Sequence, residues 1–323
     1  MMLPHQNKQP SSSNKFRLYL DQNHFDDRLV LGTWSLGGSH FGSYDTRIAG
    51  DVIKQAYERG IRQFDSAEFY AKGQSQVILR NALRSYDAYS YVLHLKAGLR
   101  WKGNQVFHDG SAAHLKTVVR DALKFFKRDS MDVFLLHWPD PSLDIRIACD
   151  TLSKLKEKGA IHVWGLCNLS KEEVLLVQGY DYSLCQWHYN PLYRHDEKVM
   201  NRMQDKQVMV YGYSPFEQGL LVNPRYSQES VLSKRDVRNR NPLFFDTDIK
   251  TRLQRLFLLD TAGFSYSHCI LQWLFQKSFL DTVIIGPRYL KHLNDSCDVL
   301  SFSEADKKRL RYSDFYQALE NIF

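Results

Sequence analysis

Three ionisable residues of the chain stand in positions where they could do acid–base chemistry together. Asp65, Lys96 and His137 each come directly after the last apolar residue of a short apolar run. A charged residue at the end of one strand is usually only the polar edge of a loop. When three successive runs end in an acid, a base and an imidazole, a catalytic site becomes the better interpretation.

A tyrosine adds a proton donor to this group. Tyr70 lies five residues beyond Asp65, in the segment that leaves the same apolar run. A phenol has a pKa of about 10, which is too high for a ready acid at neutral pH. A nearby ammonium such as that of Lys96 lowers this pKa, and a buried lysine needs a counter-charge such as Asp65. The group therefore predicts proton transfer from Tyr70 to an oxygen that becomes an alkoxide.

The apolar runs that carry these residues belong to a repeated pattern of strand and helix. Near-continuous apolarity, typical of strands covered on both faces, occurs at residues 29–31, 61–64, 91–95, 133–136, 161–166, 184–187, 208–211 and 283–285. Between these runs the apolar residues recur at spacings of three and four, most clearly over 111–127, which indicates helices with one buried face. Ser111 is a suitable helix N-cap, and Gly60 and Gly159 stand where two other helices would end.

The repetition predicts the fold class. Eight strand–helix units in about 290 residues are the size of a single-domain (β/α)8 TIM barrel of the α/β class. A doubly wound sheet is the competing architecture, but the glycine-rich segment 37–42 lacks the spacing of a dinucleotide-binding turn. We expect the barrel over residues 16–323. Residues 1–15 are polar and rich in serine, and we expect them to form a disordered tail rather than a secretory signal.

The composition excludes several classes of protein. No apolar run reaches the roughly 18 to 20 residues of a membrane helix. Five cysteines without a CxxC pair support neither a disulfide framework nor a zinc ribbon, so we expect a cytoplasmic protein without a metal site or a membrane partner. The 43 lysines and arginines exceed the 36 aspartates and glutamates, which gives a net charge of +7. Nucleic-acid binding rests on this charge alone and stays the weakest alternative, so we expect no nucleic-acid partner.

The segment 64–75, which reads FDSAEFYAKGQS, resembles the signature of the aldo-keto reductases. Further motifs that are similar to those of the family follow in the expected order between about residues 29 and 300, namely GTW, LKAG, LLHWP, GLCNLS, QWHYN, YSP, QGLL and IGPR. That family reduces aldehydes and ketones with NAD(P)H on a (β/α)8 barrel, without metal or flavin. The resemblance therefore implies a carbonyl reductase whose partner is a small-molecule carbonyl compound.

The resemblance implies a role for each matching residue. Tyr70 would donate the proton, Lys96 would lower its pKa, Asp65 would hold Lys96, and His137 would orient or polarise the carbonyl group. The residues implied to bind the cofactor are Thr33, Trp34, Asn168, Gln186, Tyr213, Ser214, Pro215, Gln218, Leu220, Gly286, Arg288 and His292.

Four of these positions carry the cofactor interpretation. Asn168 and Gln186 match residues that hold the nicotinamide carboxamide, and Tyr213 matches the aromatic residue that stacks on the nicotinamide ring. Arg288 matches a basic residue near the adenosine 2′-phosphate, which implies NADPH in preference to NADH because a guanidinium suits phosphate geometry. Several positions depart from the family pattern, namely Ala71, Gln76, Cys167, His188, His292 and Ser296.

The sequence gives weaker evidence on the substrate and on regulation than on the catalytic residues. Trp34, Trp101 and Trp138 follow strand ends at the active rim, which predicts a pocket for apolar or aromatic carbonyl compounds.

The long segment 219–247 carries Arg225 and Arg238; it either closes over the cofactor pyrophosphate or is a solvated basic loop. The departures from the pattern leave a second function open, a cofactor-binding regulatory subunit with little turnover, like channel-associated members of the family. The oligomeric state does not follow from the sequence, and the helical pattern at 303–319 could cover the barrel or a partner.

Overall fold

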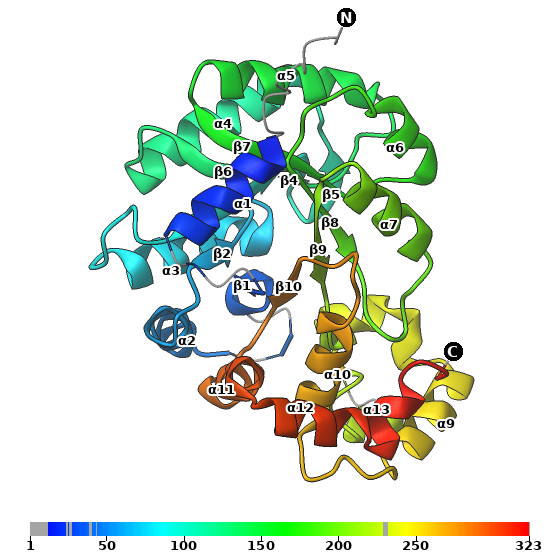
Figure 1. Ribbon diagram of the computed structural model, residues 1–323. Coiled ribbons are helices and arrows are strands. Elements are labelled where there is room, and N and C mark those ends of the chain that lie inside the picture. The colour runs from blue at the N-terminus through cyan, green and yellow to red at the C-terminus, as the bar shows by residue number, and fades with distance from the viewer. Residues whose placement is uncertain are drawn as a thin grey trace, which may run out of the picture.

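The computed structural model describes residues 12–23, 25, 28–38, 41–42, 44–228 and 232–322. In these residues parallel strands close into a barrel with helices around it (Figure 1). The barrel strands are β1 (Leu29–Gly32), β2 (Gln63–Asp65), β3 (Val92–Ala97), β6 (Met131–Leu136), β7 (Ile161–Cys167), β8 (Leu184–His188), β9 (Met209–Tyr213) and β10 (Thr282–Ile285). Each pairs in parallel with its neighbours along the chain, and β1 pairs with β10 to close the ring. The predicted single-domain (β/α)8 barrel is therefore confirmed.

Helices follow the strands and bury their apolar faces against the barrel. They are α2 (Thr46–Glu58), α3 (Gln74–Leu83), α4 (Ala112–Phe126), α5 (Ile145–Glu157), α6 (Lys171–Leu176), α7 (Glu197–Asp205), α8 (Arg225–Gln228), α9 (Thr247–Leu256), α10 (Tyr266–Phe275) and α11 (Leu290–Asp298). Ser111 caps α4 as predicted, because its side chain accepts a hydrogen bond from the backbone N–H of His114. Gly60 and Gly159 follow α2 and α5 with φ angles of 95° and 72°, the left-handed conformation that ends a helix.

A further helix, α1 (Ser12–Gln22), covers the amino-terminal end of the barrel. Phe16 and Leu20 lie one helical turn apart, and both are buried against inward-facing strand residues such as Val30 and Val92. Figure 1 shows α1 lying across the end of the ring of strands. The tail predicted for residues 1–15 is therefore wrong for residues 12–15, which belong to this helix, whereas residues 1–11 lie outside the described part of the chain.

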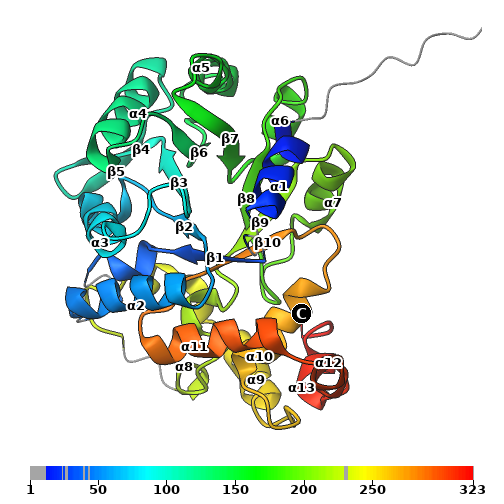
Figure 2. The ribbon, with the colours of Figure 1, turned by 60° about the vertical axis from the view of Figure 1, so that its left-hand side comes forward.

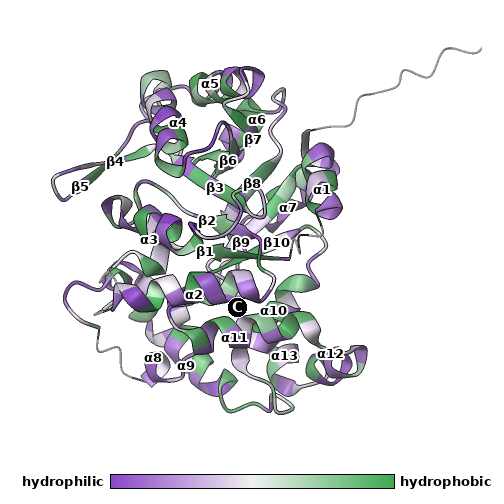
Figure 3. Ribbon diagram, turned by 90° about the vertical axis from the view of Figure 1, so that its left-hand side faces the viewer, coloured by the Kyte–Doolittle hydropathy of each residue, from purple (hydrophilic) through white to green (hydrophobic). Residues whose placement is uncertain are grey.

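A hairpin that the sequence pattern did not predict follows β3. Strands β4 (Leu99–Lys102) and β5 (Gln105–His108) pair antiparallel, and Figure 3 shows them projecting from the barrel. All residues of β5 are exposed, so the hairpin contributes no periodic apolar face by which it could be recognised. The hairpin begins only three residues after Lys96, which places it beside the catalytic end of β3.

The carboxyl-terminal segments fold as several short elements. The single helix predicted over 303–319 is instead divided into α12 (Glu304–Arg311) and α13 (Asp314–Ala318), seen beside α10 in Figure 2. Ser313 separates them because its side chain accepts the backbone N–H of Tyr316 and donates to the carbonyl of Leu310. Short 3-10 helices complete the described chain: η1 (Trp34–Leu36), η2 (Tyr70–Gly73), η3 (Glu217–Gly219), η4 (Val237–Arg240), η5 (Pro242–Phe244) and η6 (Val299–Ser301). No described helix is long and apolar enough to cross a bilayer.

Candidate active site

A cavity of about 1760 Å³ opens at the carboxyl ends of the barrel strands. Its wall includes the predicted catalytic residues Asp65, Tyr70, Lys96 and His137. Asp65 ends β2, Lys96 lies near the end of β3, and His137 directly follows β6. Because parallel strands bring their carboxyl ends to one rim, residues far apart in the sequence meet here.

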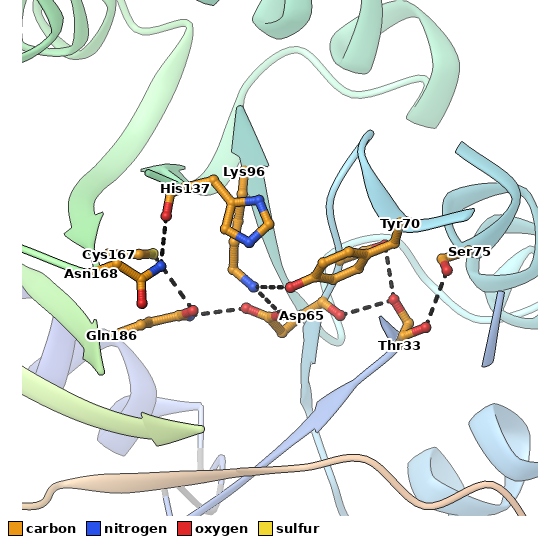
Figure 4. Close-up of polar contacts among 10 residues, drawn as sticks. Thr33, Asp65, Tyr70, Ser75, Lys96, His137, Cys167, Asn168 and Gln186 are labelled. Carbon is orange, nitrogen blue, oxygen red and sulfur yellow. Dashed lines mark hydrogen bonds and ion pairs between the residues drawn. The ribbon is translucent and has the colours of Figure 1, made fainter. Parts of the chain in front are cut away.

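A buried lysine links the acid to the tyrosine (Figure 4). Lys96 Nζ donates to Asp65 Oδ1 at 2.5 Å and to the Tyr70 hydroxyl oxygen at 2.8 Å. The Lys96 and Asp65 side chains are only 4% and 2% exposed. Gln186 Nε2 donates to the second carboxylate oxygen of Asp65 at 2.9 Å, and this second hydrogen bond fixes the orientation of the carboxylate. The predicted Asp65–Lys96–Tyr70 chain therefore exists as a contiguous hydrogen-bonded unit.

The backbone around Tyr70 is held in an unusual conformation. Ala71 and Lys72 have φ angles of 48° and 54°, in the left-handed region that disfavours residues with a Cβ. Strained residues of this kind persist only where the surroundings fix them, and they cluster at functional sites. Thr33 contributes to that support, because its hydroxyl lies 3.0 Å from the Asp65 carbonyl oxygen and its own carbonyl accepts from Ser75 Oγ at 3.1 Å.

Burial and the charges of the group determine whether Tyr70 keeps its proton. Burial raises the pKa of Tyr70 to about 12, although the Lys96 ammonium beside it acts to lower that pKa. Lys96 therefore acts in the predicted direction, but desolvation outweighs its ammonium and the resting pKa of Tyr70 stays above its ordinary value. Burial acts to lower the pKa of Lys96, but the Asp65 carboxylate, together with Tyr70 and Cys167, outweighs it, so the pKa of Lys96 is raised. At neutral pH the site thus holds a neutral phenol next to an ammonium.

His137 is kept neutral beside the tyrosine. Burial and the Lys96 ammonium hold the pKa of His137 well below its ordinary value. Its ring meets the Tyr70 ring edge to face, with centroids 5.4 Å apart. The Nδ1 atom of His137 is buried without a hydrogen-bond partner in the described structure. A neutral imidazole with a spare ring nitrogen can donate or accept one hydrogen bond toward a bound molecule.

Most of the residues predicted to bind a cofactor line the same cavity. Those on its wall are Trp34, Asn168, Gln186, Tyr213, Ser214, Pro215, Gln218, Gly286, Arg288 and His292. Thr33 and Leu220 are not on the wall: Thr33 lies behind Asp65, and Leu220 is fully buried in the hydrophobic core. Tyr213 donates to Asn168 Oδ1 at 2.5 Å, and Asn168 Nδ2 donates to the His137 carbonyl at 2.8 Å. These bonds join the predicted cofactor side of the cavity to the catalytic group.

Two arginines converge on the loop after β1. Arg288 donates through both terminal nitrogens to the carbonyls of Phe41 and Gly42, while its charge lies over the Tyr44 ring at 4.6 Å. Arg238 is held by Asp236 through two hydrogen bonds of 2.6 and 2.9 Å, and it lies on the same cavity wall. Arg225 is exposed and lines only a small neighbouring pocket. The described residues of the segment 219–247 form the short helices α8, η4 and η5, and η4 carries Arg238 to the cavity wall.

Some buried polar atoms of the cavity wall have no hydrogen-bond partner among the described residues. Gln218 Oε1 and Arg288 Nε are buried without a hydrogen-bond partner, as is Nδ1 of His137. Buried polar groups are normally paired, and a polar ligand in the cavity is one partner that these atoms could take. The residue set fits a nicotinamide dinucleotide, because amides, an aromatic ring and arginines line the same cavity. Over the described residues there is no group of three or more metal-ligating side chains.

Aromatic residues form a further part of the cavity wall. Trp34 and Trp138 line the cavity as predicted, together with Phe69 and His108. Trp101 does not line the cavity; it stacks on Phe69 with a centroid distance of 4.8 Å and donates Nε1 to the Phe69 carbonyl. Phe69 therefore takes the wall position that the sequence predicted for Trp101, its supporting residue. The position of Phe69, directly before Tyr70, was the available signal.

A barrel whose carboxyl end unites a tyrosine, a lysine, an aspartate and a histidine defines a class of barrel oxidoreductases. The comparison with protein families is specific: the model of the Aldo/keto reductase family matches residues 28–314. The chain belongs to this family.

Known relatives agree with this assignment. The chain is 29% identical over 269 residues to Aldo-keto reductase YhdN of Bacillus subtilis (strain 168), with 81% of each chain covered. It is 25% identical over 313 residues to the NADH-specific methylglyoxal reductase of Escherichia coli (strain K12), which covers 91% of this chain and 95% of the relative. The structure of a glycerol dehydrogenase from Gluconobacter oxydans superimposes with a TM-score of 0.77 at 24% identity, with 91% and 90% of the two chains covered. This last likeness shows the fold.

Proposed function

We propose that the protein is an NADPH-dependent reductase of aldehydes and ketones, with apolar or aromatic carbonyl compounds as substrates. The observation that carries the proposal is the buried hydrogen-bonded chain from Asp65 through Lys96 to Tyr70, which faces the cavity beside a neutral His137. General acid catalysis needs a proton donor within hydrogen-bond reach of the oxygen that becomes an alkoxide. Tyr70 supplies that donor.

The direction of the hydrogen bonds explains how Tyr70 would act. Lys96 donates to the Tyr70 oxygen, so the phenolic proton is left free for a carbonyl oxygen in the cavity. As this proton leaves, the ammonium at 2.8 Å stabilises the phenolate that forms. His137 would donate a second hydrogen bond to the same oxygen and orient the carbonyl group. The nicotinamide, when bound, supplies the hydride.

The cationic side of the cavity supports the proposed preference for NADPH. Arg288 presents a guanidinium with an unpaired Nε, and Arg238 lies nearby on the same wall. Two guanidinium groups favour the additional phosphate of NADPH over NADH. Since one relative is named for specificity toward NADH, NADH is the alternative to test. Arg288→Ala should weaken NADPH binding by about tenfold or more and NADH binding much less; equal effects would assign Arg288 to a part common to both cofactors.

The aromatic wall supports the proposed substrate class. Trp34, Phe69 and Trp138 surround the approach to Tyr70, and such walls bind apolar and aromatic molecules. The regulatory-subunit alternative is less favoured, because all groups needed for turnover are assembled in one hydrogen-bonded unit. Buried free thiols occur at Cys149, Cys167, Cys185 and Cys269, and they support our proposal of a reducing, cytoplasmic setting.

The test is reduction of a panel of aldehydes and ketones by wild type and Tyr70→Phe, with NADPH and with NADH. We expect turnover to fall by about 10² to 10⁴ in the variant, because general acid catalysis contributes on that scale. Cofactor affinity should stay unchanged. Tyr182→Phe is the matched control: this buried tyrosine donates to Met203 Sδ and lies outside the cavity wall. Near-normal turnover in Tyr70→Phe would overturn the assignment, and cofactor binding without turnover in wild type would favour the regulatory subunit.

A further inference from the structure

A second hydrogen-bonded pair, His188 and Glu217, reaches the wall of the same cavity through His188 and takes no part in the catalytic group. His188, the last residue of β8, places Nε2 at 2.6 Å from Oε2 of Glu217, the first residue of η3. The Glu217 side chain is fully buried, whereas that of His188 is 23% exposed and lines the cavity. A carboxylate is buried in this way only when it is paired and hydrogen-bonded.

Glu217 ties three segments of the chain together. Asn190, in the loop after β8, donates to Oε2 at 2.7 Å, and Asn241, between η4 and η5, donates to Oε1 at 2.7 Å. Burial acts to raise the pKa of Glu217, but the hydrogen bond and charge of His188 with these amides outweigh it and lower that pKa. The ionised carboxylate therefore connects the β8 end, the β9 loop and the segment that carries Arg238.

His188 in turn supports the ring predicted to stack on the nicotinamide. Its imidazole lies nearly parallel to Tyr213, with centroids 5.4 Å apart and a 15° interplanar angle, and to Tyr193, with centroids 4.1 Å apart. His188 and Tyr213 are also register partners in the β8–β9 ladder. With one nitrogen bound to Glu217 and its ring stacked on two tyrosines, the imidazole is suited to hold geometry rather than to move protons.

The loop between Tyr213 and Gly219 needs such support. Ser214, Glu217 and Gln218 have φ angles of 57°, 45° and 54°, which are left-handed values that residues with a Cβ avoid. Asn190 holds the first of them by donating to the Ser214 carbonyl at 2.9 Å, and Glu217 holds the second through its own carboxylate. The same loop supplies Ser214, Pro215 and Gln218 to the cavity wall.

We propose that His188 and Glu217 are positioning residues, which fix the Tyr213 ring and the 214–219 loop as one preformed platform for the nicotinamide half of the cofactor. The proposal rests on the proposed function, since the platform has this role only if the chain binds a nicotinamide cofactor. Removing either partner leaves the other without this hydrogen bond, so the two residues act as a unit.

The test is a double-mutant cycle on cofactor affinity, measured by fluorescence titration with NADPH and by displacement with NADP+. His188→Phe keeps an aromatic ring for stacking but removes the donor, and Glu217→Gln removes the charge at nearly constant shape. We expect each single variant to raise the Kd for both cofactors by about tenfold, and the double variant to raise it no further. Glu197→Gln is the matched control: this carboxylate is bound by Arg194 at 2.6 Å, away from the cavity, and its loss should leave the Kd within twofold.

A thermal unfolding scan of each variant separates positioning from a merely structural role. A structural role would lower the melting temperature and leave the Kd of the folded variant within twofold of wild type, and that result would overturn the proposal. Additive effects of the two substitutions on the Kd would also overturn it. If Glu217→Gln does not fold, the Kd of His188→Phe decides alone. If the wild type binds neither NADPH nor NADH, the proposed function itself is refuted. If the wild type and the variants all bind the cofactor normally, only the proposed role of His188 and Glu217 is refuted.

Discussion

Replacement of Lys96 by methionine separates the structural from the catalytic role of the buried ion pair. Methionine is close to lysine in length and apolar, so the substitution removes the ammonium with little change in volume. The Asp65 carboxylate, 2% exposed, then loses its 2.5 Å partner and keeps the neutral amide of Gln186 at 2.9 Å. Tyr70 loses the donor that lies 2.8 Å from its oxygen.

The expected loss of stability follows from this geometry. Removing one partner of a buried pair leaves an uncompensated charge and destabilises a protein by about 3 to 5 kcal/mol. An unfolding entropy of about 2.1 cal/mol/K per residue over 323 residues converts this into a fall in melting temperature of about 4 to 7 °C. The double variant Lys96→Met, Asp65→Asn removes the stranded charge and should recover most of the loss. Neither variant should recover turnover, because Tyr70 no longer has a cation to stabilise its phenolate.

The assay is urea unfolding followed by circular dichroism, beside turnover with a reducible carbonyl compound and NADPH. The reasoning predicts opposite behaviour of the two readouts: stability returns in the double variant, while activity stays at least about 10²-fold below wild type. A single variant destabilised by less than about 1 kcal/mol would refute the argument, since such a value is typical of an exposed pair. A double variant no more stable than the single one would refute the stranded charge as its cause.

Two further predictions concern the barrel interior. Burial, with the Lys96 ammonium nearby, lowers the pKa of His94 from 6.5 to about 3. Below pH 6.5 the histidine therefore takes up a proton in the unfolded chain but not in the folded one, and the folded state loses stability. In His94→Gln the fall in unfolding free energy between pH 7 and pH 5 should shrink by about 2 kcal/mol, measured by urea titration at both pH values; an unchanged difference would show that His94 is not held neutral. Leu20→Ala, in the helix that covers the barrel floor, should reduce stability by about 2 to 5 kcal/mol because the side chain is fully buried, and a loss below 1 kcal/mol would mean that α1 does not pack there in solution.

The catalytic group could be predicted from the sequence because barrel topology converts strand ends into neighbours. Asp65, Lys96 and His137 are spread over 73 residues, yet each ends an apolar run and so reaches the same rim. The strand order confirms that these residues are neighbours, since β2, β3 and β6 are adjacent in the barrel. Tyr70 required more, because only the residues around it and the resemblance of segment 64–75 to a family signature distinguished it from a loop aromatic.

Elements without periodic burial could not be predicted in the same way. The exposed hairpin β4–β5 shows no apolar alternation, and α1 depends on two residues, Phe16 and Leu20, that contact the interior of the barrel. Trp101 was assigned to the pocket wall because it follows a strand end. Only the three-dimensional structure shows that Phe69 stands between it and the cavity, as its stacking partner.

The resting state of Tyr70 lay beyond the sequence for a different reason. The residues indicate that an ammonium lies near a phenol, but the sign of the shift in pKa depends on how much water each group loses. Since burial wins and the pKa of Tyr70 rises to about 12, the phenol keeps its proton at neutral pH. Lys96 therefore does not deprotonate the resting tyrosine. Its ammonium acts on the phenolate that exists only after the proton has been given away, which is a stabilisation specific to the transition state and the product of proton transfer.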